Sequence, residues 1–120
     1  MRPYVDVDLD SEVLERKEGL IARYKVRVKA IAFSPDDEIV EGTVRCVHYG
    51  QLIGGRKTEI DIFPGVGNIT GSGSCDDPYV VEGEFESAKY PGLWCCIATV
   101  KDSKGNKITV KKGLGLDKKD

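Results

Sequence analysis

An all-β fold is predicted for this chain, built as an antiparallel β-sandwich of seven to eight strands in one domain that spans residues 1–120. Three observations predict it. Several segments alternate apolar and polar side chains with a period of two, which is typical of strands with one buried face. Gly, Pro, Asn and Asp cluster between these segments, and Gly alone accounts for 14 of the 120 residues. A hydrophobic content of 40% is enough to form a single core in a chain of this length.

The N-terminal segment YVDVDLD, residues 4–10, alternates strictly, with valine and leucine on one face and three aspartates on the other. We expect a half-buried strand here. The next residues, SEVLERKEG at 11–19, lose the alternation, so we expect a charged connector or a short helix. The aspartates lack the glycine and the final glutamate of a calcium-binding EF-hand loop. Residues 1–19 are therefore expected to form an N-terminal strand and connector.

A long strand is expected over residues 20–33, and its outer face carries a row of basic side chains. These are Arg23, Lys25, Arg27 and Lys29. Such a stripe could bind an anionic ligand, for example an acidic glycan. Acidic stripes at residues 6–10, 59–61 and 82–86 offer another interpretation, in which the cations pair with carboxylates across the sheet. The many acidic partners favour this structural interpretation, and the four cations remain the ligand-binding candidates.

Four further strands are expected at residues 38–49, 57–63, 79–87 and 93–101, followed by a return strand. The Gly- and Ser-rich segment 65–78 is expected to be a loop. It contains Asn-Ile-Thr beginning at Asn68, which makes Asn68 a candidate N-glycosylation site. Residues 112–120 are expected to form a flexible tail.

The segment GLWCCIATVKDSKGNKITV, residues 92–110, predicts two antiparallel strands joined by a tight turn. Alternation places Trp94 and Cys96 on one face and Cys95 on the other. The pattern PG-L-W-x-C-x-A-x-V-x-D-S-x-G-N-x-x-T is similar to the last hairpin of immunoglobulin-like sandwich modules, particularly the bacterial Ig-like and PKD-type repeats. The resemblance covers roughly a sixth of the chain. It implies an Ig-like β-sandwich and no specific function.

The four cysteines, Cys46, Cys75, Cys95 and Cys96, allow three full disulfide pairings. Adjacent cysteines on a strand point to opposite faces, which is poor spacing for a zinc site. The resemblance implies that Cys46 and Cys96 form the inter-sheet bridge of an Ig-like domain, which leaves Cys75 to pair with Cys95. The chain departs from antibody-type domains in one respect. Their core tryptophan follows the first cysteine, whereas Trp94 lies beside the second.

Charge and hydropathy exclude several classes of function. The net charge of −2, from 18 basic and 20 acidic residues, provides no overall attraction to nucleic acid. No apolar run approaches the ~20 residues that span a bilayer, so no membrane span is expected. His48 is the only histidine, and no nucleophile motif surrounds Ser72, Ser74 or Cys75, its candidate partners. We therefore expect no enzymatic activity, no cofactor and no bound metal.

Three functions are consistent with these observations. The first is a non-enzymatic extracellular module for adhesion, scaffolding or ligand binding, with a protein or glycan partner at the cell surface. The second is a self-assembling filament or surface-layer subunit, joined by strand addition through residues 4–10. The third is a small metal-binding or hydrolytic protein that uses His48. The expected extracellular or cell-surface location depends on the cysteines and on Asn68, because the residues after Met1 do not form a signal peptide.

Overall fold

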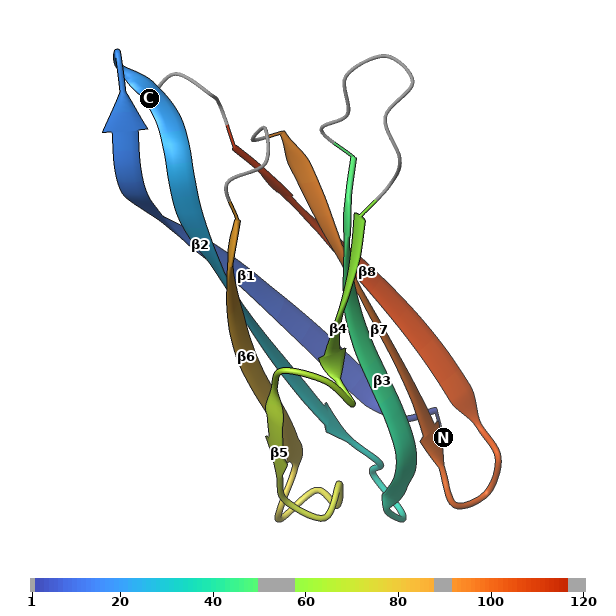
Figure 1. Ribbon diagram of the computed structural model, residues 1–120. Helices are drawn as coiled ribbons and strands as arrows, with labels where there is room; N and C mark the ends of the chain where they lie inside the picture. Colours follow the sequence, from blue (N-terminus) through green and yellow to red (C-terminus); the bar gives the residue numbers. More distant parts are fainter. Residues whose placement is uncertain (1, 50–57, 88–91, 117–120) are drawn as a thin grey trace.

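The computed structural model describes residues 2–49, 58–87 and 92–116, and the regular structure in these residues is entirely β. The strands are β1 (Tyr4–Lys17), β2 (Leu20–Phe33), β3 (Ile39–His48), β4 (Thr58–Phe63), β5 (Asn68–Thr70), β6 (Tyr79–Ser87), β7 (Leu93–Asp102) and β8 (Lys107–Gly115). They form two four-stranded antiparallel sheets with the orders β1-β2-β6-β5 and β4-β3-β7-β8, packed against each other as two layers (Figure 1). The predicted all-β fold of two antiparallel sheets is confirmed, and its strand order is compatible with an Ig-like sandwich.

The N-terminal strand is much longer than expected. β1 continues to Lys17 and pairs with β2 along its whole length, from Tyr4 opposite Phe33 to Lys17 opposite Leu20. The expected connector or helix at residues 11–19 is therefore strand and turn. Its alternation is lost because the register shifts twice between Val13 and Arg16, and a bulge inserts an extra residue into the period of two.

Two other segments contain more strand than their composition suggests. The expected loop at 65–78 includes β5, which pairs with β6 from Asn68 opposite Glu82. β8 runs to Gly115, so the first residues of the expected tail at 112–120 belong to the second sheet. Residues 117–120 lie outside the described part of the chain.

The core lies between the sheets and is centred on the single tryptophan. Trp94 and Tyr24 are both fully buried, and the indole Nε1 of Trp94 donates a hydrogen bond to the Tyr24 hydroxyl at 2.9 Å. The Phe85 ring lies 4.8 Å from the Trp94 ring between ring centres. Because Trp94 is on β7 and Tyr24 is on β2, this bond joins the two sheets and satisfies polar groups that burial would otherwise destabilise.

Candidate functional site

The outer face of the sheet β1-β2-β6-β5 carries the predicted basic stripe, and the structure pairs every cation of that stripe with a carboxylate. Register explains the pairing, because β2 lies between the acidic stripes of β1 and β6. The nearest N–O distances are Arg23–Glu86 2.7 Å, Arg27–Glu12 2.9 Å, Lys25–Glu84 3.5 Å and Lys29–Glu82 3.9 Å. We call this surface the paired face.

Arg27 is the centre of the paired face. Besides Glu12, its guanidinium reaches Asp10 at 3.3 Å and Glu84 at 3.9 Å. The hydrogen bond from Arg27 to Glu12, together with the charge of Glu12, raises the pKa of Arg27 above its ordinary value. An anionic ligand here would have to displace carboxylates that already occupy the cations. This geometry agrees with the structural interpretation of the stripe.

The outer face of the other sheet, on β7 and β8, has the opposite character. Three lysines lie on it: Lys101, Lys107 and Lys111. Lys101 is directly opposite Lys107 in the ladder, and Lys111 is opposite Ile97. None of the three forms an ion pair with another residue of the described ranges 2–49, 58–87 and 92–116. We call this surface the lysine face.

Threonine hydroxyls lie among these lysines. Thr99 and Thr109 are opposite each other, with their Oγ1 atoms 3.0 Å apart in a hydrogen bond. Two hydroxyls that share one hydrogen bond keep one O–H free to donate to a ligand. The lysine face therefore offers neutral donors as well as positive charge.

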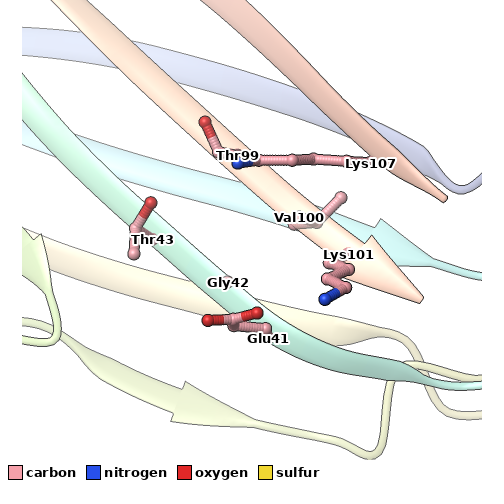
Figure 2. Close-up of a pocket in the computed structure, with 7 residues that line it drawn as sticks. All are labelled: Glu41, Gly42, Thr43, Thr99, Val100, Lys101 and Lys107. Carbon is pink, nitrogen blue, oxygen red and sulfur yellow. The ribbon is translucent and has the colours of Figure 1, made fainter. Parts of the chain in front are cut away.

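A shallow pocket of about 100 Å³ opens beside Thr99 (Figure 2). It is lined by Glu41, Gly42, Thr43, Thr99, Val100, Lys101 and Lys107. Figure 2 shows the Lys107 side chain extending from β8 toward Thr99. The volume is below the ~300–1,000 Å³ of pockets that enclose a small molecule. The pocket has room for a single charged group, not for a whole metabolite.

Sequence reasoning missed the lysine face. Alternation places Lys101 on the outer face with Thr99, and continuing it along the return strand would have added Lys107 and Lys111. Alternation does not say which residue lies opposite, however. Only the register between β7 and β8 shows that Lys101 faces Lys107 without a carboxylate between them.

The predicted inter-sheet position of Cys46 and Cys96 is wrong. Both residues are fully buried, as alternation indicated, but they are directly opposite each other on β3 and β7 within one sheet. The residues approach to 3.9 Å and are free thiols. The close approach of Cys96, together with burial, raises the pKa of the Cys46 thiol. Alternation identifies the buried face of a strand but not the sheet to which the strand belongs.

The predicted pairing of Cys75 with Cys95 is also not formed. Cys75 lies two residues after Gly73, which packs against Ile39 at the start of β3. The Gly73 carbonyl also accepts a hydrogen bond from the backbone N–H of Ser34 at 2.9 Å. The start of β3 pairs with the end of β7 at Asp102. Cys95 lies seven residues from Asp102 along β7, or ~23 Å at the rise of a strand. Both side chains are free thiols, and Cys75 lies toward the end of β7 that is farther from Cys95.

His48 is a buried residue at the end of β3, with its ring 4.6 Å from the Trp94 ring between centres. Ser72 and Ser74 lie near the opposite end of β3, nine residues away, so the structure does not bring these candidate partners together. Among the described residues, no three His, Cys, Asp or Glu side chains are arranged to hold a metal ion.

Asn68 is exposed on β5, an edge strand, where its side chain is accessible from solvent. Residues 4–10, the predicted segment for strand addition, form the first half of β1. Val5 and Val7 from this segment are buried in the core. Donating the segment to a neighbouring molecule would require both valines to leave the core and β1 to separate from β2.

Neither a protein-family model nor a curated protein matches this chain. In the described ranges there is no helix of the length and apolar character needed to cross a membrane.

Proposed function

We propose that this chain is a non-enzymatic, Ig-like module that binds a ligand outside the cell through the lysine face. The observation that carries the proposal is that Lys101, Lys107 and Lys111 form no ion pair among the described residues, beside a small pocket with threonine hydroxyls. Glu41 is opposite Lys101 in the ladder, but the two side chains are not paired. Cations that are already paired contribute to folding, whereas unpaired cations on a rigid sheet are available to a partner.

The strand order supports the Ig-like assignment. In Ig-like domains one sheet has the order A-B-E-D, and the other contains C-F-G, with an optional extra strand beside C. Naming the strands of this chain in sequence gives A-B-E-D for β1-β2-β6-β5 and C′-C-F-G for β4-β3-β7-β8. The motif at residues 92–110 then lies on the last two strands, as the resemblance implies.

The extracellular location is supported by the exposed glycosylation sequence at Asn68. The cysteines support it less than expected, because Cys75 and Cys95 are too far apart to form a disulfide. Cys46 and Cys96 are opposite each other, so oxidation outside the cell would join β3 and β7 within one sheet. An adhesion or scaffolding module needs a rigid display surface, which the sheet β4-β3-β7-β8 provides.

A combined glycan and protein array tests the function directly. The full chain is compared with two double variants that each lose two positive charges. Lys101→Gln with Lys107→Gln changes the lysine face, and Lys25→Gln with Lys29→Gln changes the paired face. We expect at least one class of ligand to bind the full chain and the paired-face variant but not the lysine-face variant. Binding that both variants reduce equally would contradict the proposal, as would the absence of any ligand.

A further inference from the structure

We infer that the ligand of the lysine face is a linear anionic polysaccharide, with one sulfate or carboxylate group seated in the pocket beside Thr99 and further groups along β8. This inference rests on the proposed function and adds the chemical class of the ligand. Three features carry it: two lysines registered opposite each other, a linear arrangement of donors and a flat surface without aromatic side chains.

The first feature is the pair Lys101 and Lys107. Like charges directly opposite each other in a ladder destabilise a sheet. Glu41 is registered on the other side of Lys101, in β3, yet no ion pair joins their side chains within the described residues. The lysine pair is thus a local concentration of positive charge, with two ammonium groups beside the single carboxylate of Glu41. A bound anion that contacts both lysines would relieve the repulsion.

The second feature is the linear arrangement of donors. Lys107, Thr109 and Lys111 alternate along the outer face of β8. At the rise of a strand, Lys107 and Lys111 are ~13 Å apart, with the Thr109 hydroxyl between them. A chain with repeated anionic groups can contact both lysines and the threonine in one extended conformation. A small free anion would use only one of these positions.

The third feature is the composition of the surface. The outer side chains of β3, β7 and β8 include no aromatic residue, and all three strands are described in full. Proteins that bind single-stranded nucleic acid stack the bases on aromatic side chains, and this surface has no such platform. Hydroxyl donors and two lysines, with Glu41 as the one carboxylate, surround a pocket of about 100 Å³ and instead match a chain of sugars that presents isolated sulfates or carboxylates.

Calorimetric titration of the full chain tests the ligand class. The probes are size-defined heparin oligosaccharides, hyaluronan oligosaccharides, a neutral dextran, a single-stranded oligonucleotide and vesicles containing phosphatidylserine. We expect heparin to bind, with an affinity that falls steeply between about 50 and about 200 mM salt as in other polyanion contacts. Hyaluronan, which carries carboxylates alone, is expected to bind more weakly, and dextran not at all.

The same two double variants locate the site. Lys101→Gln with Lys107→Gln should weaken heparin binding about tenfold, since two charge-assisted contacts are lost. Lys25→Gln with Lys29→Gln removes the same charge from the paired face and should change the affinity by less than about twofold. Thr99→Val, which keeps the shape of the side chain, tests the hydroxyl and should also weaken binding.

The outcomes separate this inference from the proposed function. Stronger binding of the oligonucleotide or the vesicles than of heparin, through the same lysines, would overturn the ligand class. A neutral glycan or a protein bound through the lysine face, without any anionic polysaccharide, would overturn the inference and leave the proposed function standing. Equal loss of heparin binding in both double variants would show non-specific attraction and overturn the inference.

Discussion

The two outer faces of this sandwich carry lysines and arginines in similar alternating patterns, but their surroundings differ. On the paired face, Arg27 contacts three carboxylates. On the lysine face, Lys101 is opposite another lysine. The hollow on the paired face, of about 240 Å³, is lined by the ion pairs Arg27–Asp10 and Lys29–Glu82. The pocket on the lysine face is lined by two lysines and one carboxylate, Glu41, and none of these three forms an ion pair within the described residues. A row of cations along one strand therefore predicts little about binding, because the neighbouring strands decide whether the charge is available.

The strongest test of this comparison removes the strand that supplies acidic partners to the paired face. Deleting residues 1–12 removes Asp10 and Glu12 from Arg27 and also takes Val5 and Val7 out of the core. Each fully buried valine stabilises the fold by roughly 1.5–3 kcal/mol, compared with a total stability of about 5–15 kcal/mol for a typical domain. We expect the truncated chain to unfold or to melt far below the full chain in circular dichroism.

The contrary result would favour a different function. A truncated chain that stays folded, in a protein whose full-length form assembles, would indicate that residues 4–10 serve a neighbouring molecule. Size-exclusion chromatography over a range of concentrations distinguishes the monomer from an assembled form. We expect the full chain to elute as a monomer throughout.

The reactivity of the cysteines is expected to differ between the two sheets. Cys75 lies in the exposed segment between β5 and β6 of the first sheet, whereas Cys46 and Cys96 are buried in the second. In the reduced native protein we expect a thiol reagent to modify Cys75 first, and Cys46 and Cys96 only on unfolding. Non-reducing peptide mapping should never find Cys75 joined to Cys95. Such a bond would contradict the placement of Cys75 near the end of β7 that is farther from Cys95.

Asp102 fixes the turn that places Lys107 opposite Lys101. Burial of its carboxyl acts to raise its pKa, but hydrogen bonds from the Asn106 side chain and from the backbone N–H groups of Asn106 and Lys104 outweigh burial and lower the pKa. A carboxyl with a lowered folded-state pKa stabilises the fold above its unfolded pKa of about 3.9, and this contribution is lost as the pH falls through the folded-state value.

The variant Asp102→Asn should therefore be less stable than the parent at pH 7, with a difference that narrows as the pH falls below about 4. Urea unfolding at a series of pH values measures the difference. Asp61→Asn, at an exposed position on β4, serves as the control and should follow the parent more closely. A constant difference for Asp102→Asn across the pH range would contradict the role of the ionised carboxylate.

The smallest expected effect compares the two faces most sharply. A lysine-to-glutamate substitution should change the free energy of unfolding in opposite directions on the two faces. Lys29 is registered between Asp8 and Glu82, so Lys29→Glu should destabilise the fold. Lys107 is opposite Lys101, so Lys107→Glu should stabilise it. Each change should amount to roughly 0.2–1 kcal/mol in urea unfolding at low salt and should shrink as salt is added. If both variants changed the free energy of unfolding in the same direction, the difference between the two faces would be contradicted.

The sequence predicted the strands and their faces well, because alternation is a local property. The buried positions of Tyr24, Cys46 and Trp94 follow from it directly. Alternation did not predict the second half of β1, because the bulges between Val13 and Arg16 interrupt the period of two. Local patterns do not predict where a chain crosses from one sheet to the other.

The candidate site depends on that missing information. Whether Cys46 and Cys96 bridge two sheets or face each other within one depends on which strands are neighbours. The same is true of Lys101, whose partner in the ladder comes from the register of β7 and β8. Strand pairing and register are set by packing of the whole core, and a single sequence shows them only indirectly.

The central claim is that the lysine face, and not the paired face, binds the ligand. Backbone amide NMR of the full chain during titration with a sulfated oligosaccharide tests it most directly. We predict that the largest shift changes will occur at Thr99, Lys101, Lys107 and Thr109 and along β8 to Lys111. The account would be contradicted by changes centred on residues 23–29 of β2, or by a saturating titration that moves none of the lysine-face amides.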